Sequence, residues 1–304
     1  MKVIGLYEGH DQAVAVSSGG RIIHAQEEER ITRIKHSNPP KNKWPVDGYN
    51  WLRSLGYDWN SVDRIALATP TSDNTRDPKS SFSSITGWKE EQDIELLGPV
   101  PDTAFPPHLR DKLFFVEHHT AHIALAWNWS GWDDCYALAV DGGGEKLLSA
   151  AAKCSREKGI EIFATEELSE ARSLQVNPGS FYLQAALAFG WKPLSGESKI
   201  TGLSAHGNRA RYRHVFEDTI SINPFASTWK TGNYSALMMR VKELAHQDAQ
   251  SRADMAAAVQ EIFEKMIFSA VREYVPKGAR LVLSGGCFAN VIVVRKQLDW
   301  ASEI

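Results

Sequence analysis

A group of histidines is the part of this sequence best suited to chemistry. Three of the ten histidines lie in the run Glu117-His118-His119-Thr120-Ala121-His122. On a helix, His118 and His122 would present both imidazoles on one side, where they can bind one metal ion. Asp141 follows the next predicted strand and could add a carboxylate, and a His-His-Asp set suits iron, manganese or zinc. Solvated or capping histidines at a helix start are the alternative. His119 would face elsewhere and contact the substrate or support the ligands.

Two glycine-rich segments could bind an anion. In 140–145, three glycines follow a predicted buried strand, so backbone N–H groups there could approach a phosphate closely, although a tight hairpin turn has a similar sequence. In 283–290, a strand runs through two glycines into a helix start, which favours a phosphate or nucleoside. The spacing fits neither a dinucleotide-binding fingerprint nor a Walker loop. The candidate binding residues are Gly142, Gly143, Gly144, Gly285, Gly286 and Asn290.

Three further segments carry side chains suited to an active site. After the first strand, His10 could act as a general base that Asp11 orients, although an Asp turn beside a surface histidine is equally compatible. The charged run 27–36 is either a solvated face or a set of cations for an anionic substrate. The cations in question are Arg30, Arg33 and Lys35. Lys199 is a candidate phosphate partner in 196–207, which its glycines predict to be a loop.

The hydrophobic pattern predicts two α/β lobes that would position these side chains. Strands are expected over 3–7, 13–16, 21–26, 64–68 and 113–116, with helices over 46–55 and 119–129. The opening pattern then recurs, with strands over 136–140, 146–153, 159–166 and 281–283 and helices over 180–190, 251–275 and 288–298. We place the first lobe at 1–132, with an irregular insertion over 69–110, and the second at 133–304. This duplicated ribonuclease-H-like pattern resembles the two-lobed actin/Hsp70 and sugar-kinase fold.

The composition is typical of a globular protein. The 304 residues are 43% hydrophobic and 23% charged, which argues against disordered, collagen-like and coiled-coil chains. Apolar runs are too short to cross a bilayer, and the N-terminus lacks the pattern of a signal peptide. The three cysteines have no metal-ligand spacing, so we expect reduced thiols and a cytoplasmic protein. A net charge of −3 predicts no bulk attraction to nucleic acid or membrane.

Taken in order, these segments resemble the O-carbamoyltransferases of nodulation-factor and antibiotic biosynthesis. The resemblance covers nearly the whole chain and rests on segments 9–11, 28–36, 117–122, 141–145, 199–207 and 285–290. The His-x3-His and Gly-Gly-x3-Asn segments are also similar to the universal tRNA threonylcarbamoyl-transferase, whose fold is shared. The charged opening run favours the O-carbamoyltransferase branch.

The resemblance implies a transfer reaction. Carbamoyl phosphate and ATP would give carbamoyl-adenylate, and an acceptor hydroxyl would then attack the carbamoyl carbon. A divalent metal (iron, manganese or zinc) would be held by His118, His122 and Asp141, with His10 as the base. The nucleotide or donor would be bound by Gly142, Gly143, Gly144, Lys199, Gly285, Gly286 and Asn290. Arg30, Arg33, Lys35 and His119 would contact the substrate. The acceptor is left open between a sugar, a polyketide or aminoglycoside hydroxyl, and a hydroxymethylated nucleobase.

The same resemblance predicts a partner. Members of the family continue beyond the Gly-Gly-x3-Asn helix with two strands, a further metal-binding Gly-Asp-x-Gly segment, and a domain that makes carbamoyl-adenylate. We therefore expect a second polypeptide that supplies the last strands of the second lobe and this domain. A fragment and a non-catalytic nucleotide-binding subunit are the alternatives, together with a tRNA threonylcarbamoyl-transferase-like protein.

Overall fold

The computed structural model divides the chain into two compact units. It describes residues 1–7, 11–35, 45–68, 97–99, 111–142, 147–167, 175–193, 195–225 and 227–304. Unit 1 comprises Met1–Ala121 and unit 2 comprises His122–Ile304. The division falls within helix α5 (His118–Ser130), whereas the sequence places the lobe boundary just after that helix.

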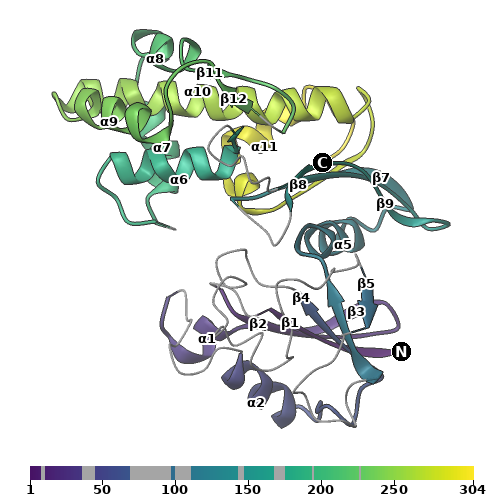
Figure 1. Cartoon of the computed structure of the whole chain (residues 1–304). Helices are drawn as coiled ribbons and strands as arrows, with labels where there is room; N and C mark the ends of the chain where they lie inside the picture. The colour runs from purple at the N-terminus through teal and green to yellow at the C-terminus, as the bar shows by residue number, and fades with distance from the viewer. Residues whose placement is uncertain are drawn as a thin grey trace. The chain divides into compact units, whose positions relative to one another are not determined.

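Unit 1 is built on one mixed sheet with the strand order β3-β2-β1-β4-β6-β5 (Figure 1). Strands β1 (Lys2–Tyr7), β2 (Ala13–Ser18) and β3 (Arg21–Glu27) form an antiparallel meander. Strands β4 (Arg64–Ala68) and β6 (Leu113–Val116) continue the sheet in parallel on the other side of β1, and β5 (Leu97–Pro99) closes it antiparallel. The predicted insertion over 69–110 lies outside the described residues except for β5.

A buried carboxylate joins the two short helices of unit 1. Glu28 begins α1 (Glu28–Thr32) and accepts the backbone N–H groups of Asp47 (2.9 Å) and Gly48 (2.7 Å) in α2 (Val46–Ser54). Burial raises the pKa of Glu28, and these two hydrogen bonds partly oppose that rise. Leu52 of α2 is fully buried in the core of this unit. Glu28 is therefore a structural link between the two helices.

Unit 2 repeats the same strand arrangement, with the order β13-β7-β8-β9. Strands β7 (Asp134–Val140), β8 (Leu147–Ser155) and β9 (Gly159–Glu167) form an antiparallel meander, and β13 (Leu281–Ser284) pairs in parallel with β7. The repeat of architecture predicted from the sequence is thus present in both sheets. Strand β8 is buried on both faces over 147–152, where small residues predominate.

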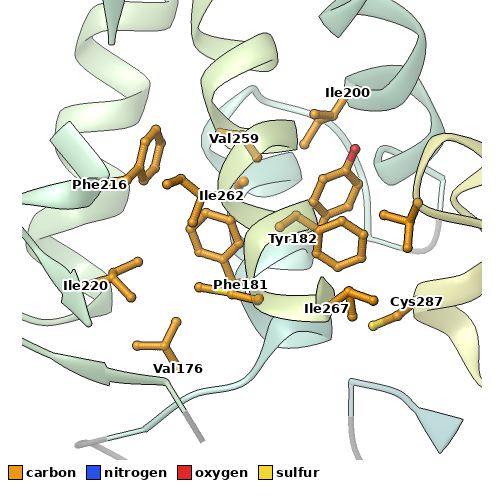
Figure 2. Packing of buried hydrophobic residues seen from close by; sticks show 14 of the residues in the cluster. Val176, Phe181, Tyr182, Ile200, Phe216, Ile220, Val259, Ile262, Ile267 and Cys287 are labelled. Atoms are coloured by element: carbon orange, nitrogen blue, oxygen red, sulfur yellow. The ribbon is translucent and has the colours of Figure 1, made fainter. Parts of the chain in front are cut away.

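Successive residues of β7 face two helical layers. Ala137 and Ala139 share a core with Ile123 of α5, whereas Leu138 and Val140 belong to the large core around α10 (Ala249–Tyr274). This alternation follows from the two-residue period of a strand. Figure 2 shows part of the large core, where Phe181 and Tyr182 of α6 (Pro178–Ala188) lie among Val259 and Ile262 of α10 and Ile200.

Several shorter elements complete unit 2. They are α7 (Glu197–Ser204), the 3-10 helix η3 (Arg209–Arg211), α8 (Arg213–Glu217), α9 (Tyr234–Ala245), the 3-10 helix η4 (Gly286–Ala289) and α11 (Val291–Gln297). A small sheet contains β10 (Gln175–Val176), β11 (Ile220–Ser221) and β12 (Ser227–Trp229). No helix in the described part of the chain is long and apolar enough to cross a bilayer.

The structure corrects two expectations about unit 2. The segment 196–207 is largely helix α7 and not a loop, because Ile200 is fully buried in the large core and fixes the helix there. Gly196 and Gly207 flank this helix, and each lies very close to another part of the chain. A Cβ at Gly207 would lie 1.9 Å from the Ala253 carbonyl oxygen. The predicted helix over 288–298 is broken at Asn290, which ends η4 and caps α11 by accepting the Val293 N–H.

Candidate functional site

Helix α5 begins where Glu117 caps it. The Glu117 carboxylate accepts the backbone N–H groups of His119 (3.0 Å) and Thr120 (2.7 Å), and also the Thr120 hydroxyl (3.0 Å). Its Oε1 lies 3.1 Å from His119 Nδ1. Burial alone would raise the pKa of Glu117, but the hydrogen bonds and the charge interaction with His119 lower it to about 2. An ionised Glu117 thus fixes the start of the helix that carries the histidines.

The structure brings the three predicted metal ligands together. His118 and His122 are one turn apart on α5, and Asp141 directly follows β7. His122 Nε2 lies 3.3 Å from Asp141 Oδ2, and one possible ligand atom from each residue lies within 4.8 Å of the others. His118 is buried, while the other two side chains are partly exposed. Two imidazole nitrogens and a carboxylate oxygen make a donor set that suits iron, manganese or zinc.

His119 points to a different environment. Its side chain is 0% exposed, with Nδ1 on Glu117, while Nε2 is buried without a hydrogen-bond partner in the described part of the chain. Because its ring and backbone both bind Glu117, His119 supports the helix start next to His118. A contact between His119 and a substrate stays a prediction.

Glycines let three backbone segments meet around Asp141. A Cβ at Gly285, whose φ is +92°, would lie 2.4 Å from the Val140 carbonyl oxygen, and one at Gly286 would lie 3.1 Å from Asp141 Oδ1. A Cβ at Gly179 would lie 2.6 Å from the Cα of Gly142. This close backbone approach is available only to glycine. Gly142 also donates its N–H to Asp141 Oδ1 (2.6 Å), and Ser180 Oγ donates to its carbonyl (3.1 Å). Gly143 and Gly144 lie outside the described residues.

The sequence interpretation missed a buried polar group beside this junction. Glu166, 2% exposed at the end of β9, accepts Ser149 Oγ (3.2 Å) and Asn177 Nδ2 (3.3 Å) on its Oε2. Asn177 in turn caps α6 by accepting the Ser180 N–H (3.0 Å). Burial raises the pKa of Glu166 to about 7, against the effect of these two hydrogen bonds. The sequence Asn177-Pro178-Gly179 is a helix-start signal with a glycine, and it could have pointed to this segment.

Two predicted nucleotide contacts have other partners. Asn290 Nδ2 donates to Gln260 Oε1 (2.9 Å) and Thr201 Oγ1 (3.1 Å), and its Oδ1 accepts from Gln260 Nε2 (3.1 Å). Asn290 is therefore enclosed in a polar network between α7, α10 and α11. Lys199 lies exposed on α7, with its ammonium 5.8 Å from the ring centre of Trp191. Nucleotide binding by Asn290 and by Lys199 stays a prediction.

The predicted site residues of unit 1 either lie on its surface or fall outside the residues that the structure describes. Arg30 pairs with Glu27 (3.3 Å) and with Glu29 (3.5 Å), and Arg33 ends α1 in the left-handed conformation. Arg30, Arg33 and Lys35 are all exposed. Asp11 begins the turn before β2, and its predicted partner His10 lies outside the described residues.

Comparison with known proteins points to one family. Residues 105–299 match the family model described as carbamoyltransferase N-terminus. The nodulation protein NolNO of Sinorhizobium fredii is 28% identical over 307 residues, which cover 95% of this chain and 42% of that protein. An uncharacterised protein of Synechocystis is 26% identical over 330 residues, covering 94% of this chain and 51% of that protein. The chain thus spans about half of the length of these curated relatives, or less.

Solved structures with a similar trace include kinases and related proteins. A ROK family glucokinase from Streptomyces griseus aligns over 98% of this chain and 88% of its own, with a TM-score of 0.38 and 13% identity. A ROK family protein from Streptococcus pneumoniae aligns over 99% of this chain and 100% of its own, with a TM-score of 0.39 and 11% identity.

Proposed function

This protein belongs to the carbamoyltransferase family, whose N-terminal model matches more than half of the chain, and we propose that it performs the transfer step of an O-carbamoyltransferase. The donor would be carbamoyl-adenylate, made from carbamoyl phosphate and ATP, and the acceptor would be a hydroxyl group. The observation that carries the proposal is the grouping of His118, His122 and Asp141 beside a glycine-lined backbone junction. Backbone N–H groups in such a glycine-rich segment could bind the phosphate of a nucleotide close to the ligand set.

The chain's own residues would bind and orient the donor. His118 and His122 would offer imidazole nitrogens and Asp141 a carboxylate oxygen to iron, manganese or zinc. A metal bound there would supply Lewis-acid polarisation of the donor. Gly142, Gly285 and Gly286 would offer backbone N–H groups to the nucleotide beside Asp141, where Gly285 and Gly286 let the chain pack closely on Val140 and Asp141. The Asp141 carboxylate is already oriented by the Gly142 N–H and by His122.

The transfer itself exchanges one carbon–oxygen bond for another. The acceptor oxygen would form a bond to the carbamoyl carbon, and the bond from that carbon to the phosphate oxygen would break. AMP would leave with the bonding electron pair, and the hydroxyl proton would pass to a base, for which His10 is the candidate. The adenylation of carbamoyl phosphate would take place on a second polypeptide that carries the remaining part of the longer relatives. The candidate acceptors are sugars, antibiotic hydroxyls and hydroxymethylated nucleobases.

Metal binding gives the first test, because it does not depend on the acceptor. Titration of the purified chain with Fe²⁺, Mn²⁺ or Zn²⁺ under anaerobic conditions should show one site. His118→Ala and His122→Ala should weaken it by at least about tenfold, since each removes one of three protein ligands. His214→Ala is the matched control, because His214 is an exposed histidine on α8. Equal metal affinity in His118→Ala and His214→Ala would show that the ligand assignment is wrong.

The transfer step is tested with the donor supplied directly. Synthetic carbamoyl-adenylate labelled in the carbamoyl group is mixed with the chain, with and without the proposed second polypeptide, and with a panel of hydroxyl compounds. Label should appear in one acceptor class and be lost in His118→Ala but not in His214→Ala. Metal binding without transfer to any acceptor in the completed complex would instead indicate a non-catalytic, nucleotide-binding subunit.

A further inference from the structure

Unit 2 contains a cavity that the proposed transfer step does not use. It has a volume of about 410 Å³ and is lined by Tyr136, Phe163, Tyr274, Trp300, Lys153 and Arg272, among others. These residues come from the three meander strands, from the end of α10 and from the segment after α11 (Figure 1). We call it the aromatic cavity. Its volume lies within the range of small-molecule sites.

The aromatic cavity is separate from the candidate metal site. Tyr136 lies near the start of β7, and Asp141 directly follows the end of that strand. Five residues of extended chain at about 3.3 Å each place their Cα atoms about 17 Å apart. A ligand in the aromatic cavity would therefore not contact the His118, His122 and Asp141 set through this strand.

Four aromatic side chains give the cavity a stacking surface. Phe163 is 51% exposed although it is a large apolar residue in the middle of a strand. Tyr136 and Tyr274 each contact it edge to face, with ring centres 6.3 Å apart in both pairs, so its orientation is fixed. The indole N–H of Trp300 donates to the Val275 carbonyl (2.8 Å), which fixes the fourth ring. An oriented, exposed aromatic group of this kind is typical of a binding surface.

Two cations at the cavity have no acidic partner. Lys153 and Arg272 are exposed, and neither pairs with a carboxylate in the described part of the chain. Other cations of the unit do form such pairs, for example Arg213 with Glu261 (2.8 Å) and Lys265 with Glu217 (2.7 Å). The Arg272 guanidinium lies 5.9 Å from the Trp300 ring centre, and this contact keeps it at the cavity. The cavity thus combines aromatic faces with free positive charge.

We propose that the aromatic cavity binds a nucleotide, with its base stacked on Phe163 and its phosphate paired with Lys153 and Arg272. A base offers the flat face that the rings require, and a phosphate offers the charge that the two cations lack. Glu273, the acidic residue of the lining, can accept a hydrogen bond from a ribose hydroxyl or an exocyclic amine. An apolar peptide segment would bury the two cations without a partner, and a bare anion would leave the rings unused. The nucleotide can be a free mononucleotide or one unit of a single-stranded nucleic acid.

Photolabelling locates the bound nucleotide. The whole chain is irradiated with 8-azido-AMP, digested and mapped by mass spectrometry. Label is expected on the peptides that contain Phe163, Tyr274 or Trp300, and it should persist in His118→Ala. The double variant Lys153→Ala/Phe163→Ala should bind AMP at least about tenfold more weakly, since it removes a stacking face and a charge. Lys158→Ala is the matched control, because it removes an exposed lysine from the same hairpin outside the cavity.

Further measurements distinguish a free mononucleotide from a single-stranded nucleic acid, and a loss of binding from a loss of folding. Competition by AMP and by an octamer of deoxythymidine distinguishes a mononucleotide site from a single-stranded nucleic-acid site. If the double variant is unfolded by circular dichroism, Arg272→Glu replaces it and should weaken binding by the same factor. Absence of label from the cavity peptides, or label confined to peptides containing Gly142 or Gly285, would overturn the proposal. The latter pattern would leave the proposed transfer function intact.

Discussion

At the residue scale, the pKa values of two buried glutamates are shifted in opposite directions. Glu117 accepts hydrogen bonds from the ring and backbone of His119 and from the backbone and hydroxyl of Thr120, which lower its pKa to about 2. Glu166 accepts only two hydrogen bonds, both on Oε2, while its buried Oε1 has no partner in the described part of the chain. Burial then prevails and raises the pKa of Glu166 to about 7. The hydrogen-bond donors, together with the charge interaction that only Glu117 has, decide the direction of each pKa shift.

Glu166 should therefore make the folded state less stable as the pH rises. Its folded-state pKa of about 7 lies above the ordinary value of 4.5, so between these values the folded chain keeps a proton that the unfolded chain has released. The free energy of unfolding should fall across this window by up to about 3 kcal/mol. Urea unfolding at pH 5 and pH 8 measures the fall, which should be smaller in Glu166→Gln because the amide does not titrate. An equal fall in both proteins would contradict the assignment.

At the element scale, the start of α6 and the interior of α7 use glycine for different reasons. Gly179 allows α6 to rest on the backbone of Gly142, whereas a Cβ at Gly202 of α7 would meet no atom within 4 Å. Gly179→Ala should lower the free energy of unfolding by about 1–3 kcal/mol, because the added Cβ would clash with the backbone of Gly142, which cannot move aside as a flexible side chain could. Gly202→Ala should raise it by about 0.5–1 kcal/mol through helix propensity. Thermal melting of the two variants checks both signs, and a stabilising Gly179→Ala would refute the close packing.

Long periodic elements could be predicted from the sequence, and elements fixed by distant contacts could not. The strands of both meanders and the long helix α10 follow from their apolar patterns, and so does the His118, His122 and Asp141 group, since it needs only one helical turn and the next strand. The strands of the small sheet have only two or three residues, too few to carry a pattern, and they depend on packing against the rest of unit 2. Helix α9 does have apolar residues at helical spacing, with Leu237, Val241 and Leu244 buried, and the sequence interpretation missed it. Glu166 escaped notice because Ser149 and Asn177 are distant in sequence.

At the scale of the whole molecule, each unit contains its own hydrophobic core. Leu52 is buried in the core of unit 1 and Phe263 in the large core of unit 2. Leu52→Ala and Phe263→Ala should each cost about 2–5 kcal/mol through a lost apolar contact and a residual cavity. If the cores unfold separately, scanning calorimetry should show two transitions, with Leu52→Ala lowering one and Phe263→Ala the other. A single transition that both variants lower equally would mean that the two cores unfold together.

The final residues of the chain also bear on the proposed partner. Glu303 forms a parallel bridge with Arg280, its carbonyl accepts the Leu281 N–H (3.0 Å), and its carboxylate pairs with the Arg280 guanidinium (2.8 Å). These contacts run along the side of β13 away from β7. The proposed second polypeptide would extend the sheet of unit 2 along this side of β13. Amides of β13 should then exchange hydrogen more slowly when that protein is added, and unchanged exchange in a formed complex would exclude this mode of assembly.

The double-sided burial of β8 has a consequence for how freely this protein can vary. From 147 to 152 each side chain is enclosed, while on the neighbouring strand β9 positions 161 and 165, which do not line the aromatic cavity, are open to solvent. In a library that samples every substitution, functional survivors should be sparse along β8 and plentiful at the open positions of β9. Strand β8 would then tolerate little beyond its present small residues, whereas the open positions of its hydrogen-bonded neighbour β9 could accept side chains of many kinds.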